Sequence, residues 1–250
     1  AEVLAQLAHP NIVPIYNIGV DAQSRPFYSM KLIKGRTLQA VLNLIRDGDT
    51  AAIKEYPRAT LLTIFRKVCD AMMFAHSQDI LHRDLKPENI MIADDGYLKL
   101  IDYGFAKVVT KRTYTICGTP EYIAPEILLN SGHSKPVDWW TFGILVYEMH
   151  AGFAPFTDDD PLQIYKKIIN TKPKYPDGFD KELKSLIKHL LRRDLSKRYG
   201  NLVNGIADIK GHRFFTSIDW NALLSKKIDA PWVPTLKAPS RTVSSFLKDR

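Results

Sequence analysis

One stretch of the chain combines acidic, basic and amide side chains at a spacing that suits phosphoryl transfer. Residues 82–89 have the sequence HRDLKPEN. Asn89 precedes one short apolar run and Asp102 follows another, with an Asp-Gly turn between the runs. This pattern predicts a β-hairpin, which would place the two ends side by side. Asn89 and Asp102 would then converge as oxygen ligands for Mg²⁺ that is bound together with substrate phosphates.

Asp84 stands five residues before Asn89 in the same predicted loop. Its carboxylate is placed to face a hydroxyl nucleophile. A carboxylate beside a pair of metal ligands is the arrangement that phosphoryl transfer requires. The spacing alone therefore predicts a phosphoryl-transfer site.

These residues also carry a resemblance to a known family. HRDLKPEN followed by Asp-Tyr-Gly at 102–104 resembles the catalytic loop and the metal-binding motif of eukaryotic-type protein kinases. Residues 117–126 (CGTPEYIAPE) resemble the end of a kinase activation segment. The resemblance implies an α+β, protein-kinase-like fold with a truncated β-rich N-terminal lobe and a largely helical C-terminal lobe.

The resemblance implies transfer of the γ-phosphoryl group of ATP to a Ser or Thr hydroxyl, with ATP and Mg²⁺ as cofactors. Asp84 would orient the hydroxyl and accept its proton, and Lys86 would steady the γ-phosphate. Asn89 and Asp102 would hold Mg²⁺. Lys86, two residues after Asp84, is typical of Ser/Thr kinases rather than tyrosine kinases. The residues expected to contact the nucleotide are Met30, at the deep pocket, the hinge residues Lys31, Leu32 and Ile33, and Met91.

The same resemblance implies which residues bind the protein substrate. Cyclic-nucleotide-dependent kinases read arginines before the target residue with acidic side chains, and Glu88 and Glu148 match two such positions. Thr119 is also expected to lie in the substrate site. A third acid, expected after the hinge, is replaced by Thr37. Loss of one charged contact costs on the order of 1.5–3 kcal/mol, which predicts a weakened preference for basic residues.

The resemblance also implies a switch. Thr115 aligns with a phosphorylated threonine, and a phosphate there would pair with Arg83 and order the loop. Thr113 is the weaker alternative, and ordinary surface threonines remain a third. Three further residues are expected to be structural: Asp138 would hold the backbone of the catalytic loop, and Arg198 would pair with Glu126.

The composition of the chain argues against a membrane protein and against a nucleic-acid-binding protein. The chain has 250 residues, 45% of them apolar and 25% charged, which is ordinary for a globular protein. The absence of a long apolar run predicts no membrane span. The two cysteines, Cys69 and Cys117, lack metal-ligand spacing, which favours reduced thiols and a cytoplasmic location. The net charge of +8 comes without a dense basic run among aromatics, so nucleic-acid binding is not expected.

The elements that must position the site follow from apolar spacing. Strands are predicted over 12–20 and 26–33, and helices over 2–8, 38–45 and 60–77. Further helices are predicted to begin at Pro136, Asp160 and Asp180. Residues 46–59 are predicted to be a surface insertion. The expected domains are a partial N-lobe (1–33), a C-lobe (34–218) and an extended tail (219–250) like that of AGC-group kinases.

The resemblance is uneven. Residues 1–92 resemble bacterial eukaryotic-like Ser/Thr kinases, and residues 95–250 resemble the cyclic-AMP-dependent kinase catalytic subunit. A Gly-rich loop and an ATP-binding lysine are not present, so weak nucleotide binding and little turnover are expected of these residues alone. Two alternatives follow: a fragment of an active kinase, and a catalytically silent interaction module. Protein substrates, a regulatory subunit or an activating kinase are the expected partners.

Overall fold

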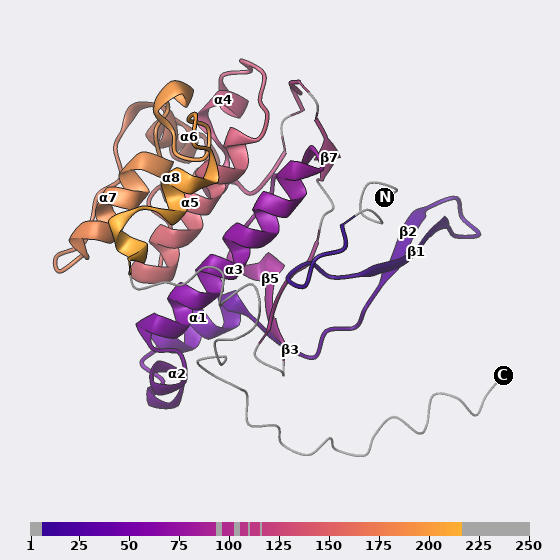
Figure 1. Ribbon diagram of the computed structural model, residues 1–250, viewed down its shortest axis with the longest axis horizontal. Helices are drawn as coiled ribbons and strands as arrows, with labels where there is room; N and C mark the ends of the chain where they lie inside the picture. The colour runs from indigo at the N-terminus through magenta and orange to yellow at the C-terminus, as the bar shows by residue number, and fades with distance from the viewer. Residues whose placement is uncertain (1–6, 94–96, 103–105, 110, 116, 217–250) are drawn as a thin grey trace.

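A computed structural model describes residues 7–93, 97–102, 106–109, 111–115 and 117–216. Figure 1 shows two unequal parts: the antiparallel ribbon of β1 and β2 stands at one side, and the helices gather on the other. Between them lies the hairpin predicted to carry the site. The strands are β1 (Ile15–Val20), β2 (Pro26–Met30), β3 (Gly35–Thr37), β4 (Ile80–Leu81), β5 (Ile90–Ala93), β6 (Leu98–Leu100) and β7 (Lys107–Val108). The α-helices are α1 (Leu38–Arg46), α2 (Thr50–Glu55), α3 (Arg58–Ser77), α4 (Pro125–Leu128), α5 (Pro136–Ala151), α6 (Pro161–Asn170), α7 (Lys181–Leu190) and α8 (Ile206–Lys210).

The predicted hairpin is confirmed. Strands β5 and β6 pair antiparallel, with Ile90 opposite Leu100, and β3 extends the sheet along the other edge of β5. The side chains of β5 and β6 alternate between buried and half-buried, as expected of strands with one face on the core. The turn predicted at residues 94–96 lies outside the described residues.

The segment before β1 is fastened to this hairpin. Val13 donates its backbone N–H to Leu100 O at 3.0 Å, and Leu100 donates to Asn11 O at 2.7 Å. The Asn11 side chain adds a buried hydrogen bond to Leu98 O at 3.1 Å. These bonds place the β1–β2 ribbon, and the expected hinge after β2, next to the strand that leads into Asp102.

Helix α5 forms the centre of the helical part. Nearly every one of its side chains is buried, as its uniformly apolar sequence predicts. Phe142 stacks on Phe65 of α3 with ring centroids 4.2 Å apart. At Gly143 a Cβ would lie 2.9 Å from Leu190 Cβ, so glycine allows α5 and α7 to approach closely.

Predicted helix ends are also confirmed. Asp160 accepts a hydrogen bond from Leu162 N at 2.9 Å, and Asp180 accepts one from Leu183 N at 2.8 Å. Each carboxylate thus satisfies a backbone donor that the first helical turn leaves free. Gly152 ends α5 in the left-handed conformation, with φ of 81°.

The surface insertion predicted at 46–59 contains a helix that the sequence analysis did not predict. Helix α2 forms there because Asp49 caps it, accepting from Ala52 N at 2.8 Å, and because Ala52 and Tyr56 are buried. The two long strands were predicted too long, since β1 begins at Ile15 and β2 ends at Met30. Most of the helix predicted at 2–8 and the tail at 219–250 lie outside the described residues.

Within the described part of the chain, no helix combines the length and the apolarity needed to cross a membrane.

Candidate functional site

The site begins with the loop between β4 and β5, and Asp138 of α5 fixes its backbone. The Asp138 carboxylate is fully buried and accepts hydrogen bonds from the backbone N–H groups of His82 (3.0 Å) and Arg83 (2.8 Å). The ring Nε2 of His76 lies 2.7 Å from the same carboxylate. Arg83 has a φ of +66°, an uncommon conformation for a residue with a side chain. The bonds to Asp138 hold the loop in this conformation.

The pKa of the Asp138 carboxyl group reflects both its burial and its hydrogen bonds. Burial alone would raise the pKa of its carboxyl group, but the hydrogen bond and charge of His76 and the Arg83 backbone N–H lower it further than burial raises it. The pKa of Asp138 therefore lies below its ordinary value, and the group stays ionised. Burial lowers the pKa of the neighbouring His82, although Asp138 and Asp84 oppose that shift.

Asp84 is the centre of the polar contacts in the site. Its side chain is buried, with only 4% of its surface exposed. Oδ1 accepts from the Thr119 backbone N–H (3.2 Å) and hydroxyl (2.9 Å), and Oδ2 accepts from Asn89 Nδ2 at 3.1 Å. Lys86 Nζ lies 3.2 Å from Oδ2 and donates to the Thr119 hydroxyl at 2.9 Å. The structure thus brings Asp84, Lys86, Asn89 and Thr119 into one cluster.

The hairpin places the two expected metal ligands at the same end of the sheet. Ile101 donates its backbone N–H to Asn89 O at 2.9 Å, and Asp102 is the next residue. The amide nitrogen of Asn89 is occupied by Asp84, because it donates to Asp84 O (2.8 Å) as well as to Oδ2. Asp102 is exposed and has a φ of +54°. The remaining residues of the Asp-Tyr-Gly motif, 103 and 104, lie outside the described residues.

The donor set at this end of the hairpin suits a hard cation held jointly with phosphates. It consists of a carboxylate and a carboxamide, whose oxygens are ligands that Mg²⁺ accepts. Among the described residues, no group of three or more His, Cys, Asp or Glu side chains could hold a metal by itself. Such a site needs further oxygen ligands from a substrate or from water.

Four of the five expected nucleotide residues lie at or just after the end of β2, and the fifth, Met91, lies in the hairpin itself. Met30 ends β2 with 41% of its surface exposed, and Leu32 is 81% exposed. Lys31 donates its backbone N–H to Pro14 O at 3.0 Å, so this N–H is already hydrogen-bonded within the protein. Met91 lies in β5, opposite Thr37 of β3. Thr37 caps α1 by accepting from Ala40 N at 3.1 Å.

An acidic cluster contains the two expected substrate-binding glutamates. Burial raises the pKa of Glu148, and Glu88 and Glu121 raise it further, whereas a hydrogen bond from the Tyr122 hydroxyl lowers it. Burial and the charge of Glu88 also raise the pKa of Glu121. Sequence reasoning missed Glu121 and Tyr122, although both lie within the CGTPEYIAPE motif that it singled out.

The activation-segment threonines differ in their surroundings. Thr113 is buried, pairs with His133 through two backbone hydrogen bonds, and its hydroxyl accepts from Lys107 Nζ at 2.8 Å. Thr115 is exposed. A modifying enzyme would therefore reach the Thr115 hydroxyl more readily than that of Thr113.

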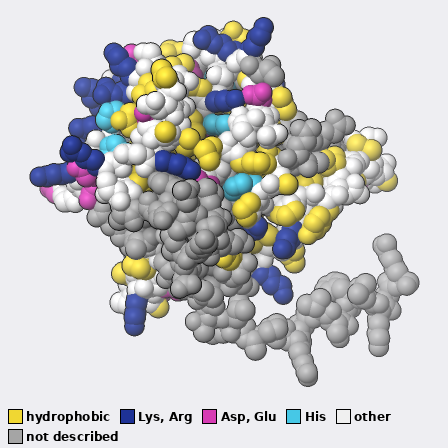
Figure 2. Space-filling view, viewed as in Figure 1, with side chains coloured by type: hydrophobic (Ala, Val, Ile, Leu, Met, Phe, Trp, Pro, Cys, Tyr) yellow, Lys and Arg dark blue, Asp and Glu magenta, His cyan; other side chains and the backbone are white. Residues whose placement is uncertain are grey.

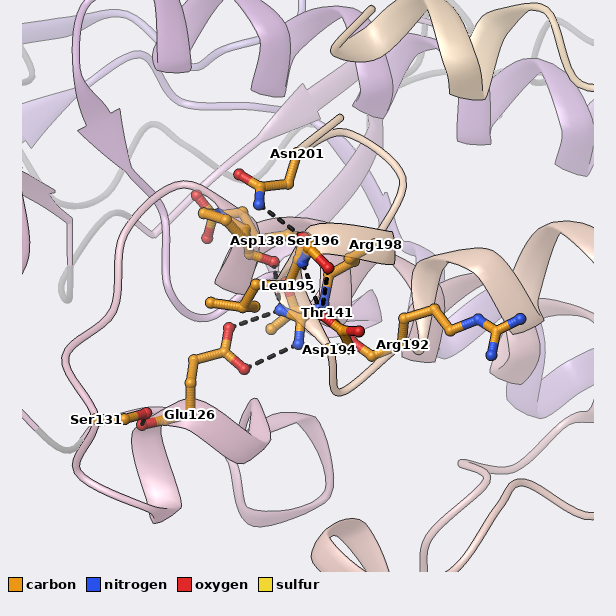
Figure 3. A network of polar contacts seen from close by, with 11 residues as sticks. Glu126, Ser131, Asp138, Thr141, Arg192, Asp194, Leu195, Ser196, Arg198 and Asn201 are labelled. Atoms are coloured by element: carbon orange, nitrogen blue, oxygen red, sulfur yellow. Dashed lines mark hydrogen bonds and ion pairs between the residues drawn. The ribbon is translucent and has the colours of Figure 1, made fainter. Parts of the chain in front are cut away.

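A buried ion pair ties the end of this segment to the segment between α7 and α8. Arg198 has no exposed surface and binds Glu126 through two parallel hydrogen bonds, Nη1 to Oε1 at 2.6 Å and Nη2 to Oε2 at 2.9 Å (Figure 3). It also donates to Pro136 O at 2.9 Å and to Arg192 O at 2.7 Å. The pair is therefore hydrogen-bonded on both sides, which a buried pair needs to offset its desolvation.

The chain is similar to known proteins over most of its length. The model of the protein kinase domain family matches residues 1–215. The chain is 39% identical to cAMP-dependent protein kinase type 3 of Saccharomyces cerevisiae over 244 residues, which is 98% of the chain and 59% of that protein. It is 49% identical over 241 residues to a cAMP-dependent protein kinase catalytic subunit of Homo sapiens, covering 96% of the chain and 64% of that protein. A catalytic subunit of Dictyostelium discoideum is 40% identical over 235 residues, covering 94% of the chain and 35% of that protein.

The similarity covers nearly all of this chain but only part of each relative. The chain spans 59%, 35% and 64% of the lengths of these three relatives. The similarity to cAMP-dependent kinases covers nearly the whole chain and is not confined to residues 95–250. The likeness of residues 1–92 to bacterial kinases stays a prediction.

Proposed function

The chain belongs to the protein kinase family, and on that premise we propose that it carries the catalytic loop and metal-binding end of an ATP-dependent protein serine/threonine kinase. The observation that carries this proposal is the contact set of Asp84. Its buried carboxylate is held at both oxygens by Thr119 and Asn89, with the Lys86 ammonium at 3.2 Å. A base fixed in this way is ready to orient a hydroxyl without reorganisation.

Each polar residue of the cluster has a role in this proposal. Asp84 orients the acceptor hydroxyl of the substrate and takes its proton on a carboxylate oxygen. Lys86 donates to Thr119 and adds positive charge beside Asp84, where a transferred phosphoryl group would carry negative charge. Asn89, through its side-chain oxygen, and Asp102, through its carboxylate, would hold Mg²⁺. Mg²⁺-ATP, when bound, supplies the phosphoryl group and neutralises its oxygens.

The nucleotide base is assigned to the segment after β2. Met30 would border the pocket, residues 31–33 would face adenine with their backbone, and Met91 would close the opposite side. The support is positional: backbone bonds from residues 11–13 to β6 keep this segment beside the hairpin that carries Asp102.

Substrates and regulation are also proposals. Glu88, Glu121 and Glu148 form a negative surface that suits proteins with basic residues near the Ser or Thr acceptor. Thr115, the exposed threonine, is the proposed phosphorylation site, with Arg83 as the partner of its phosphate. Regulation by a subunit or an activating kinase, and a cytoplasmic location, fit this reading. A catalytically silent interaction module is not favoured, because Asp84, Lys86, Asn89 and Asp102 are all present.

Isothermal titration of Mg²⁺-ATP tests the metal assignment. Asp102→Ala is expected to weaken the affinity for Mg²⁺-ATP and to reduce its dependence on Mg²⁺, because one of two protein ligands is lost. The matched control is Asp177→Ala, which removes an exposed aspartate of the loop between α6 and α7 and should leave the affinity within twofold of wild type. An unchanged, Mg²⁺-dependent affinity in Asp102→Ala would remove Asp102 from the metal site.

A further inference from the structure

A cavity lies on the helical part of the molecule, between α5, the segment that follows α6, and α7. Its volume is about 680 Å³, within the range of about 300–1,000 Å³ that is usual for small-molecule sites. Trp140 of α5, Phe156, Tyr175 and Leu191 provide apolar walls. Trp140 and Phe156 stack nearly parallel, with ring centroids 6.2 Å apart and an interplanar angle of 5°. None of the residues assigned to phosphoryl transfer lines this cavity.

The rim of the cavity is strongly basic. Six Lys and Arg side chains line it together with one carboxylate, Asp194. That carboxylate is already engaged, because it accepts from Ser196 N and Oγ and pairs with Lys197 at 3.2 Å. Figure 2 shows Lys and Arg side chains gathering along the side of the molecule where Figure 1 places α7.

These basic side chains differ in whether they already have a hydrogen-bond or ion-pair partner. Arg193 donates through Nε to Ile168 O at 2.9 Å and through Nη2 to Thr171 O, so it fixes the wall formed by the end of α6. The other cations, Lys172, Lys184, Lys188 and Arg192, have no carboxylate partner among the described residues.

The free cations are arranged around one opening. Lys184 and Lys188 are four residues apart on α7 and therefore share a face. Arg192 lies just beyond the C-terminal end of α7, and in Figure 3 its side chain extends away from the Glu126–Arg198 pair. The Lys184 ammonium lies 4.8 Å from the centroid of the Tyr175 ring. Like charges this close favour a bound anion, because it relieves their mutual repulsion.

Two residues that line the cavity, Trp140 and Tyr175, each hold a buried hydrogen-bond donor without a partner among the described residues. The Trp140 indole Nε1–H is buried, in a residue with 1% exposure, and has no acceptor among the described residues. The Tyr175 hydroxyl is likewise buried without a partner there. Leaving a buried donor unpaired costs about 1–3 kcal/mol, so each such group calls for a reason. Burial raises the pKa of Tyr175 above its ordinary value, which keeps the hydroxyl protonated and able to donate.

We propose that this cavity is a ligand site, separate from the phosphoryl-transfer site, for a small phosphate- or carboxylate-bearing molecule with an aromatic or aliphatic body. Its anionic group would lie among Lys172, Lys184, Lys188 and Arg192. Its body would pack on Trp140 and Phe156, and an acceptor atom would take the unpaired donors. The proposal is independent of the function proposed above, because it uses none of the same side chains.

Titration of the ¹⁵N-labelled chain with 2-naphthyl phosphate tests this. Each of the four tryptophans contributes one indole N–H resonance, and Trp140→Phe identifies the one from Trp140. We expect saturable binding that shifts the Trp140 indole resonance. Lys184→Gln/Lys188→Gln should raise the dissociation constant at least tenfold. The matched control, Lys54→Gln/Lys166→Gln, removes two exposed charges elsewhere and should change it less than twofold.

Four outcomes would overturn the proposal. The first is an unmoved Trp140 indole resonance at saturation, and the second is an equal loss of affinity in the two double variants. The third is equal affinity for 2-naphthol or for inorganic phosphate, since either would remove one half of the recognition. The fourth is tighter binding of a glutamate-rich peptide than of the aryl phosphate, which would assign the surface to a protein partner.

Discussion

The carboxylate of Asp138 accepts a hydrogen bond of 2.8 Å from the backbone N–H of Arg83, the residue immediately before Asp84. The proposed base is therefore positioned by a buried charge on α5, more than fifty residues later in the chain, and not by its own loop alone. Because α5 is the most deeply buried helix, it gives this loop a rigid support.

Asp138→Asn should lower the free energy of unfolding by about 2–4 kcal/mol, because hydrogen bonds to a buried charge are lost and His76 loses its partner. Urea denaturation measures this. The matched control is Asp79→Asn, which removes the charge from a surface pair with Lys135, with side chains 46% and 41% exposed. That change should stay within about 0.5 kcal/mol. Equal losses in the two variants would contradict a special role for Asp138.

Arg198→Lys should also destabilise the protein, by about 2–4 kcal/mol, although the charge is kept. A lysine cannot form the two parallel hydrogen bonds to Glu126 or the further bonds to Pro136 O and Arg192 O. Arg112→Lys, at an exposed residue that bonds Ser131 O at 3.3 Å, is the control and should be nearly neutral. Thermal and urea unfolding of both variants provide the comparison, and a neutral Arg198→Lys would refute the structural role.

The raised pKa of Glu148 predicts the sign of a pH effect. Its ordinary value is 4.5, and burial moves the folded-state value upward. Between the two values the folded state binds more protons than the unfolded state, so this group makes stability fall as pH rises through that interval. Tyr122→Phe removes the hydrogen bond that lowers the pKa of Glu148. The Glu148 carboxyl resonance, followed by ¹³C NMR, should then titrate at higher pH than in wild type; a lower pH would contradict the assignment.

Thr37 predicts a limited preference for basic substrates. It stands where a third acid was expected, and its hydroxyl instead caps α1. Thr37→Glu should strengthen selection for arginine three residues before the acceptor by roughly ten- to a hundredfold, which corresponds to about 1.5–3 kcal/mol for a charged hydrogen bond. Thr37→Ser, which keeps the cap without adding charge, is the control. In peptide-array profiling of an active form that also carries a Gly-rich loop and an ATP-binding lysine, a dominant arginine at that position with Thr37 unchanged would contradict this prediction.

The local part of the site could be predicted from the sequence because its signals are local. Alternating apolar residues on both sides of an Asp-Gly turn specify the β5–β6 hairpin, and the hairpin by itself brings Asn89 close to Asp102. Asp160 and Asp180 likewise cap helices through residues two or three positions away.

Contacts between distant segments were less predictable. Helix α2 was missed because Gly48 and Pro57 frame a polar segment. Ala52 and Tyr56 are buried once α2 packs against α1, a contact that the local sequence pattern does not show. The contact of Tyr122 with Glu148 joins residues 26 positions apart, and no periodic pattern in the sequence predicts it. The basic cavity is also invisible in the sequence, because its cations come from α7 and the loops on either side of it.

The central claim is that Asp84 acts as the base for a Ser or Thr hydroxyl. The most direct test is single-turnover transfer from γ-labelled ATP to a serine peptide, with ATP affinity measured in parallel. It compares Asp84→Asn with the unmodified sequence, both in an active form that also carries a Gly-rich loop and an ATP-binding lysine. Asparagine keeps the size and an acceptor oxygen but cannot take the proton. In Asp84→Asn the rate should be at least about a hundredfold lower, with ATP affinity unchanged. A rate within a few fold of wild type would contradict it.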